Sequence, residues 1–443
     1  MTIGKAWHSY WFRPAPLVNL AVCRIVCVGA QLALLLLVYN NFDQLFQLPE
    51  SFYRPIPILR GILLLFGHSP FPPFERPPDG VISTAYWITI ASGGFALVGL
   101  FTRASLFLFA FGNAFLQAFR YSFSDFHHPE ALMMIALCLL ALSPAARALS
   151  LDDLFARLRQ TTQRKSFERF RTVDETHIFA GWPLLLTGIL LSIVYLDAAM
   201  KKLQAGGLDW MNGHTLQYYL LAQGGAERGS EIAAWIGQHY AMAVLLSWIT
   251  ILWEGTFFII LMFGSLIWLY LPLGVAMHVG MCITKLACFY QYIALYAVFV
   301  PWSSIVMAVS RKYQTSPSRK VQIVFDGGCI LCVRSMTVVQ YLDWFERFDY
   351  VDIRSHFGFA ETAVNENLDL RRAEMLAVRP DGASRAGFFA WREIVLRLPV
   401  LWPLLVLFYL PGASLIGPKV YRAIASRRAR FADCADGTCS LQH

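Results

Sequence analysis

The sequence has little charge for its length. Only 15% of its 443 residues are charged, while 57% are hydrophobic, and an average soluble domain carries about 25% charged residues. This composition argues against one large soluble domain. The formal net charge of +8 is modest, and the positive excess lies in a few loops and in the C-terminal tail. That distribution favours the cytoplasmic loops of a membrane protein over nucleic-acid binding.

The sequence also lacks a secreted disulfide framework, an internal repeat and a low-complexity segment. Because the first apolar run is not followed by a cleavage site, we expect it to be retained as a span. The nine cysteines are too dispersed for the dense pattern of a small secreted domain. Five lie in apolar segments (Cys23, Cys27, Cys138, Cys282 and Cys288) and four lie in the tail (Cys329, Cys332, Cys434 and Cys439).

Long apolar runs are present instead. Several reach the ~20 residues that a membrane-spanning helix needs, and we predict a membrane all-α bundle of about eight spans. The apolar piece 56–66 is too short to cross, so we expect it at the membrane interface. The piece 398–410 is also short and contains Pro399 and Pro403, so we expect it to lie on the surface or to be re-entrant, with a ninth span as the alternative. The predicted spans are 16–39, 84–101, 105–119, 131–149, 179–200, 241–263, 265–284 and 287–307.

The basic residues predict the orientation of these spans. Arg103, the arginine-rich loop 152–175 and the segment 311–320 fall on one side when eight spans are counted, and the positive-inside rule makes that side cytoplasmic. We therefore predict a multi-pass protein of the bacterial inner (plasma) membrane with both termini in the cytoplasm. The assignment depends on a tight turn at Phe263-Gly264-Ser265. The predicted domains are 1–312 in the membrane, a linker at 313–318, and a cytoplasmic domain at 319–443.

The stretch Phe325-Asp326-Gly327-Gly328-Cys329-Ile330-Leu331-Cys332 carries the clearest chemical signal. It follows a strand-like run, 321–325, and precedes a helix-like run, 333–342, and a Cys-x-x-Cys in that position is typical of thioredoxins. A helix N-terminus favours a thiolate on Cys329, which would attack, while Cys332 would resolve the mixed disulfide. Half of a metal site and two buried cysteines are the alternatives.

Two further cysteines close the sequence, Cys434 and Cys439. They could exchange with Cys329 and Cys332, complete a four-cysteine zinc site, or form an unpaired tail. The rest of the tail predicts an α/β domain, with strands near 350–353 and on both sides of a Pro-Asp-Gly turn within 375–387, and a helix near 389–397. Residues 420–430 predict a basic amphipathic helix that suits an anionic membrane surface.

This tail resembles the DCC family of thiol-disulfide oxidoreductases. Asp326, Cys329 and Cys332 match its Asp-x-x-Cys-x-x-Cys motif, and the resemblance covers about 319–439. It implies a thioredoxin-like fold and chemistry of the protein-disulfide reductase type, with a thiol partner in the cytoplasm. One departure is that Arg372-Ala373-Glu374 stand where thioredoxins carry a cis-proline. Further matches are Val378–Gly382, Leu398-Pro399, Leu410-Pro411-Gly412 and Tyr421-Arg422.

A second candidate site lies at the end of the fifth predicted span, where Lys201 and Lys202 are adjacent. Lysines at the end of a span are ordinarily interfacial anchors. Two adjacent ammonium groups also repel each other, which could leave one amine neutral and able to act as a base.

The region 6–310 resembles the vitamin K-dependent γ-carboxylase-like (HTTM) membrane domain. The resemblance implies that Lys202 is the amine that starts quinol oxygenation, with a contribution from His128 or from His127. It suggests a quinone or a lipid-like ligand in the bundle. Because the β-rich portion that holds the carboxylase's protein substrate is absent, carboxylation of protein glutamate is not expected. The matching residues are Lys201, Lys202, Leu203, Asp209, Trp210, Gly213, Tyr218, Tyr219, Leu220, Arg24, Phe126, His127, His128, Leu149, Asp152, Met277 and His278.

Three ionisable residues lie within predicted spans: Arg24, Glu254 and His278. Such residues are costly in a bilayer and commonly mark functional sites, so we expect them to line a polar cavity that binds a quinone or lipid-like ligand. Arg24 could instead snorkel, and His278 could simply bond to a carbonyl group.

These observations lead to three hypotheses. The first is a membrane-bound thiol-disulfide oxidoreductase acting through Cys329, Cys332 and Asp326. The second is a carboxylase-like membrane enzyme using Lys202, with the tail as a sensing or structural module. The third is a transporter or lipid-binding protein without catalysis. A bilayer core is about 30 Å thick, so the predicted topology excludes direct thiol attack on a ligand beside Lys202 unless the ligand moves or a carrier transfers the electrons.

Overall fold

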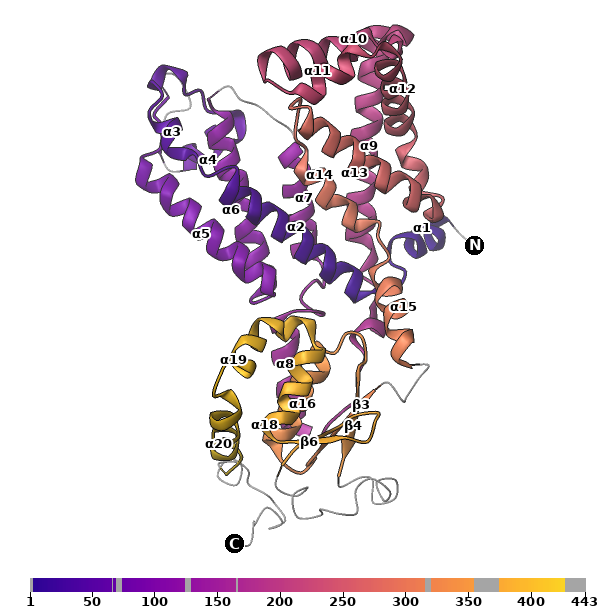
Figure 1. Ribbon diagram of the computed structural model, residues 1–443. Helices are drawn as coiled ribbons and strands as arrows, with labels where there is room; N and C mark the ends of the chain where they lie inside the picture. The colour runs from indigo at the N-terminus through magenta and orange to yellow at the C-terminus, as the bar shows by residue number, and fades with distance from the viewer. Residues whose placement is uncertain are drawn as a thin grey trace. The chain divides into compact units, whose positions relative to one another are not determined.

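The computed structural model describes residues 3–65, 67–68, 74–123, 129–164, 166–314, 320–353 and 374–426. The chain forms two compact units. The helical unit contains residues 1–150 and 176–301, and the C-terminal unit contains residues 151–175 and 302–443. Most of the described chain is helical, and the one sheet of more than two strands there belongs to the C-terminal unit (Figure 1).

Apolar runs of 14 to 26 residues form the long helices of the helical unit. Gly99, with φ +71°, ends one of them in a left-handed conformation that glycine adopts without a steric cost. Its α-helices are α1 Ile3–Trp11, α2 Leu17–Leu37, α3 Phe42–Phe46, α4 Pro57–Leu65, α5 Asp79–Val98, α6 Thr102–Tyr121, α7 Pro129–Leu142, α9 Gly181–Gly206, α10 His214–Tyr218, α11 Glu231–Gln238, α12 Tyr240–Thr256, α13 Ile267–Ile283 and α14 Tyr290–Leu295.

Five described helical stretches are long and apolar enough to cross a membrane, or up to seven if each of two bent pairs is one span. One bent pair, Pro399–Tyr409 with Ala413–Ser426, lies in the C-terminal unit and turns by 109°. The other pairs Tyr290–Val298 with Trp302–Arg311. The five stretches are Leu17–Leu37, Asp79–Val98, Gly181–Asn212, Tyr240–Leu261 and Gly264–Ile283.

Three predicted spans are not among these five stretches. One of them, 287–307, falls on the bent pair Tyr290–Val298 with Trp302–Arg311. In the region of 105–119, α6 has 20 residues, but Asn113, Gln117 and Arg120 lower its hydropathy. In the region of 131–149, α7 has only 14 residues. The predicted turn at 263–265 does separate two long apolar stretches. Several long apolar helices are thus compatible with a multi-pass membrane protein, and the number eight stays a prediction.

The core of the helical unit is formed mainly by α2, α6, α7, α9 and α14. Leu20, Phe109, Leu137, Leu191 and Leu295 have no solvent exposure. Strands β1 Ala15–Pro16 and β2 Thr176–His177 form a short two-stranded ladder. The ladder joins the first part of the helical unit, 1–150, to its second part, which begins at residue 176. Polar residues are buried in the same bundle, so its interior is not purely apolar.

The sheet of the C-terminal unit has the strand order β4-β3-β5-β6. Strand β3 pairs in parallel with β4 and antiparallel with β5, which pairs antiparallel with β6. Helix α16 makes the crossover between the parallel strands, as parallel pairing requires. The elements are β3 Val321–Phe325, α16 Ile330–Leu342, β4 Phe348–Asp352, β5 Leu376–Val378, β6 Ser384–Ala386, α18 Phe388–Arg397, α19 Leu405–Tyr409 and α20 Ala413–Ser426.

The predicted tail elements agree with these bounds within a few residues. Side chains alternate along β3, with Val321, Ile323 and Phe325 buried, which is the period of a strand. The Pro-Asp-Gly turn lies between β5 and β6 as expected. The predicted surface piece 398–410 is helical, and the predicted basic helix begins earlier, at Ala413.

The segment 151–175, predicted only as a charged loop, is part of the C-terminal unit. It contains α8 Leu151–Arg164, which packs on α16 (Figure 1). The Phe167 ring lies 5.0 Å from the ring of Phe325 and 5.5 Å from that of Tyr350. Gln340 donates to the carbonyl oxygen of Phe170 at 2.7 Å. The predicted domain boundaries at 312 and 319 leave the segment 151–175 outside the C-terminal domain. Helix α15 Trp302–Gln314 also groups with the C-terminal unit.

Candidate functional site

The turn between β3 and α16 is held by two carboxylates. Asp326 accepts a hydrogen bond from the backbone N–H of Gly328 at 2.9 Å, and Asp352 accepts one from that of Gly327 at 2.9 Å. A Cβ atom at position 327 would lie 2.0 Å from an oxygen of Asp352, so a larger residue here would displace the Asp352 carboxylate. The sequence-predicted residue Asp326 is therefore placed to shape the turn that precedes the cysteines.

Cys329 and Cys332 stand at the start of α16. Cys329 is the residue before the first helical turn, with an extended backbone, and its carbonyl oxygen accepts from the N–H of Val333 at 3.0 Å. Cys332 follows one turn later on the same helix. The two residues are only 5% and 8% exposed, so both sulfur atoms lie close to the apolar core. A helix N-terminus stabilises negative charge at this position.

Cys332 lines an apolar cavity of about 580 Å³. The walls next to the cysteine come from β3 and α16, including Phe325 and Met336. The opposite wall comes from α19 and α20, including Phe408 and Ile416. Ligand sites in proteins commonly have volumes of about 300–1,000 Å³ and mostly apolar linings. The arrangement places a thiol at the wall of a cavity that could hold a small apolar molecule.

Residues 323–433 match the family model of the DCC1-like thiol-disulfide oxidoreductases. We call these residues the DCC1-like domain. The match confirms the resemblance predicted for the tail and points to a redox function. No curated protein and no solved structure matches this chain, and the HTTM resemblance of the helical unit stays a prediction.

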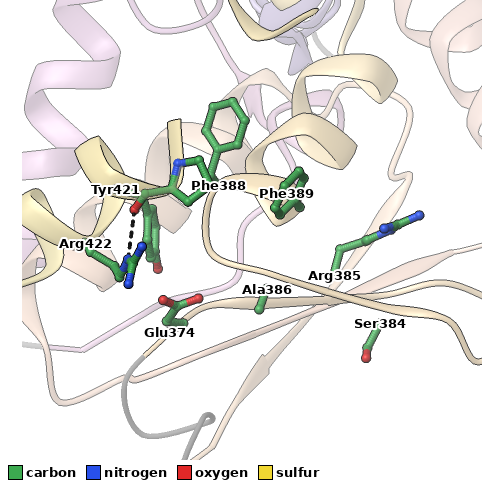
Figure 2. Close-up of a pocket in the computed structure, with 9 residues that line it drawn as sticks. Glu374, Ser384, Arg385, Ala386, Phe388, Phe389, Tyr421 and Arg422 are labelled. Carbon is green, nitrogen blue, oxygen red and sulfur yellow. Dashed lines mark hydrogen bonds between the residues drawn. The ribbon is translucent and has the colours of Figure 1, made fainter. Parts of the chain in front are cut away.

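A second cavity of the DCC1-like domain is polar and measures about 370 Å³. Figure 2 shows the carboxylate of Glu374 directed toward Tyr421 and Arg422, with Arg385 directed away from them. The hydroxyl oxygen of Tyr421 accepts a hydrogen bond from the N–H of Met375 at 3.1 Å. Tyr421 thus attaches α20 to the start of β5. This contact gives a structural role to Tyr421, one of the residues that carry the resemblance to the DCC family.

The residues that the structure describes do not support a metal site. Among the residues placed by the structure, no group of three or more His, Cys, Asp or Glu side chains could hold a metal ion. Cys434 and Cys439 lie outside the described residues, so a four-cysteine zinc site and exchange with Cys329 and Cys332 stay predictions.

Asp343, at the far end of α16, is the most strongly perturbed carboxylate outside the helical unit. Burial raises the pKa of Asp343 to about 6, although the N–H groups of Arg347 and Phe348 donate to it at 2.8 and 3.1 Å. Glu393 shows the opposite balance. Its burial would raise the pKa, but ion pairs with Arg379 and Arg397 lower it overall.

In the helical unit, the two adjacent lysines have different partners. Lys202 donates to both carboxylate oxygens of Glu254, at 2.8 and 2.6 Å, with side chains 27% and 9% exposed. Lys201 pairs with Asp197 at 2.7 Å, and these side chains are 71% and 55% exposed. The sequence argument considered only repulsion between the lysines. The structure adds a carboxylate partner for each ammonium group.

His278 belongs to a buried cluster of aromatic residues. Its Nε2 atom lies 2.8 Å from the hydroxyl oxygen of Tyr195, which lies 2.7 Å from that of Tyr296. Its Nδ1 atom has no hydrogen-bond partner among the residues that the structure covers. The ring of Trp253, the neighbour of Glu254, packs on Tyr195 at 4.7 Å. The structure therefore brings Glu254 and His278, both predicted, into one region.

Arg24 does not join this cluster in the structure. The guanidinium group of Arg24 donates to the carbonyl oxygens of Ala145 and Leu149, at 3.0 and 2.5 Å. This buried arginine connects α2 to the chain after α7, which is a structural role. His127 and His128 lie outside the described residues.

The sequence analysis missed a second polar cluster around Glu130. This buried carboxylate accepts hydrogen bonds from the hydroxyl groups of Tyr39, at 2.8 Å, and of Tyr121. Gln291 donates to the hydroxyl oxygen of Tyr39 at 3.0 Å. An acid at the start of an apolar run was the available signal. Asp352 was also missed, because its contact with the Cys-x-x-Cys turn depends on the pairing of β3 with β4.

Proposed function

We propose that this protein is a thiol-disulfide oxidoreductase acting through Cys329 and Cys332. The observation that carries the proposal is the position of the two cysteines at the N-terminus of α16, with Cys332 at the wall of a ligand-sized cavity. The family match of residues 323–433 supports it. In one turnover the two thiols lose two electrons and two protons and form a disulfide, while a partner disulfide is reduced to two thiols.

A thioredoxin-like fold of the DCC1-like domain is part of this proposal. The order β4-β3-β5-β6, with a parallel pair joined through α16 and an antiparallel pair followed by α18, supports it. The third of the residues Arg372-Ala373-Glu374, Glu374, lines the polar cavity beside β6. Arg422 lines the same cavity, so a carboxylate and a guanidinium group both border it.

Thiol trapping in a graded glutathione series tests the proposal. The full-length protein is prepared with Cys282 and Cys288 replaced by serine, because these two cysteines form a disulfide of their own. We expect Cys329 and Cys332 to change together as a two-electron couple, and Cys329→Ser to abolish the transition. A further variant lacking Cys434 and Cys439 reports whether the tail thiols exchange with the pair. Thiols that stay reduced at the oxidising end of the series would refute the proposal.

We further propose an HTTM-like membrane bundle for the helical unit, with about eight spans and both termini in the cytoplasm. The buried Lys202–Glu254 pair and the His278–Tyr195–Tyr296 cluster support a polar site for a quinone or lipid-like ligand. Replacing Lys202 by alanine and Cys329 by serine separately, and comparing the phenotypes, tests whether chemistry at Lys202 is independent of the thiols. Dispensable lysines, combined with essential Glu254 and His278, would favour a transporter or lipid-binding protein.

A further inference from the structure

The apolar cavity beside Cys332 is bounded on one side by the bent helix pair α19–α20, here called the hairpin, which is anchored at two places. Leu407 and Ile416 line the cavity and are 62% and 63% exposed, so the cavity is open to its surroundings. On one side, Arg392 donates to the carbonyl oxygen of Phe408 at 2.8 Å, and the Phe388 and Phe408 rings stack at 5.3 Å. On the other side, Tyr421 accepts from the backbone of Met375. The cavity lies between these anchors, so its volume of about 580 Å³ is a consequence of how the hairpin is attached.

The lining of this cavity selects for an apolar molecule. Apart from Cys332, Ser335 and Tyr421, its side chains are hydrocarbon, thioether, aromatic or indole groups. A charged or strongly polar oxidant such as glutathione disulfide would lose its hydration there without gaining matching hydrogen bonds. A molecule that enters this space and reacts with a thiol pair has to be apolar and able to exchange two electrons.

The outer face of the hairpin indicates where such a molecule comes from. Val406 and Leu415 are 65% and 76% exposed, and further large apolar side chains are exposed beside them. Lys419 and Arg422 are exposed on the same helix, α20. A bent apolar pair with neighbouring basic residues suits the interface of an anionic bilayer. The chain has at least five helices long and apolar enough to span a membrane, and a bilayer is the natural source of such an apolar molecule.

We propose that the cavity binds a lipid-soluble quinone as the two-electron partner of Cys329 and Cys332. This rests on the proposed thiol-disulfide function and names its substrate class. Cys332 is the cysteine at the cavity wall. The two S–H bonds break, an S–S bond forms between Cys329 and Cys332, and the quinone takes both electrons and both protons to become a quinol. The reverse reaction regenerates the dithiol.

Decylubiquinone is a suitable probe because its ring is fully substituted and does not add thiols. The full-length protein in nanodiscs, with Cys282 and Cys288 replaced by serine, is reduced and freed of reductant. The rate of formation of the Cys329–Cys332 disulfide is then measured by mass tagging of thiols, once with decylubiquinone and once with glutathione disulfide. The ratio of the two rates is the readout, since it cancels a general disturbance of the thiols.

Two variants in α20 provide a matched comparison. Ala413 lines the cavity, whereas Ala423 is exposed and does not. We expect Ala413→Trp to lower the ratio at least tenfold by filling the cavity, and Ala423→Trp to leave it within twofold of the parent. An unchanged ratio in Ala413→Trp overturns the proposal, and so does a parent protein that glutathione disulfide or a peptide disulfide oxidises but decylubiquinone does not. Failure of the proposed function itself is distinct, because then no oxidant forms the disulfide.

Discussion

The two units of this protein place polar groups in apolar surroundings in different ways. In the C-terminal unit, the turn and both cysteines come from one stretch of eight residues, 325–332, so the site is local in the sequence. In the helical unit, Lys202 and Glu254 are 52 residues apart, and Tyr195 and His278 are 83 residues apart. The comparison shows that a local site can be recognised from spacing, whereas a distributed site becomes visible only when the helices are packed.

The ion pairs of the two adjacent lysines in the helical unit also show a difference that the sequence does not reveal. Lys201 and Lys202 are neighbours, yet the Lys201–Asp197 ion pair is exposed and the Lys202–Glu254 ion pair is mostly buried. Exposed pairs contribute about 0–1 kcal/mol, whereas breaking a buried pair leaves an uncompensated charge. Adjacent residues of one type can therefore have roles that only the tertiary structure distinguishes.

The largest effect is expected from Glu254→Ala. This change leaves the ammonium group of Lys202 without its carboxylate, and we expect the free energy of unfolding to fall by about 3–5 kcal/mol. Thermal unfolding of the full-length protein in detergent measures it. Asp197→Ala, which removes the exposed partner of Lys201, is the control and should cost no more than about 1 kcal/mol. Equal losses in the two variants would contradict the distinction between the lysines.

The next effect concerns Asp343 of the C-terminal unit. Its folded pKa of about 6 lies above its ordinary value of 3.8, so the folded state holds the proton more tightly and stability falls as the pH rises from about 4 to about 6. The two-unit difference corresponds to about 3 kcal/mol. We expect Asp343→Asn to remove this pH dependence.

Hydrogen exchange in the full-length protein measures this pH-dependent contribution of Asp343 to stability. The quantity compared is the protection factor of peptides covering 343–352 at pH 4 and at pH 7. The comparison of wild type with Asp343→Asn isolates the contribution of Asp343 from that of other carboxylates. The expected direction of the pH dependence would be wrong if the wild-type segment, compared with the variant, were better protected at pH 7 than at pH 4.

The smallest of the three effects is expected from Phe167→Ala. Phe167 lies in the segment 151–175, which belongs to the C-terminal unit although it stands between α7 and α9 in the sequence. Phe167 is half-buried against Phe325 and Tyr350, so we expect a loss of about 2 kcal/mol, roughly half that of a fully buried phenylalanine. Limited proteolysis within 151–175 should accelerate. Phe155→Ala removes an exposed ring of α8 and should change little; similar acceleration in both variants would argue against docking of this segment.

Much of the C-terminal unit could be predicted from the sequence. The strand 321–325, the helix after Cys332, the turn between β5 and β6 and the helix 389–397 were expected because alternation, Gly and Pro positions and short spacing are local signals. The contribution of 151–175 was not, since nothing in a charged loop shows which surface it contacts. The apolar cavity was also missed, because it depends on where α19 and α20 pack.

The sequence alone determined that this chain has several long apolar helices, a Cys-x-x-Cys between a strand and a helix, and ionisable residues within apolar segments. These features follow from composition and spacing, which act over a few residues. Only the tertiary structure decided that Lys202 pairs with Glu254, that Arg24 holds carbonyl groups, that Asp352 supports the cysteine turn and that Cys332 faces a cavity. These are contacts between residues far apart in the chain, and their energies depend on burial, which packing alone establishes.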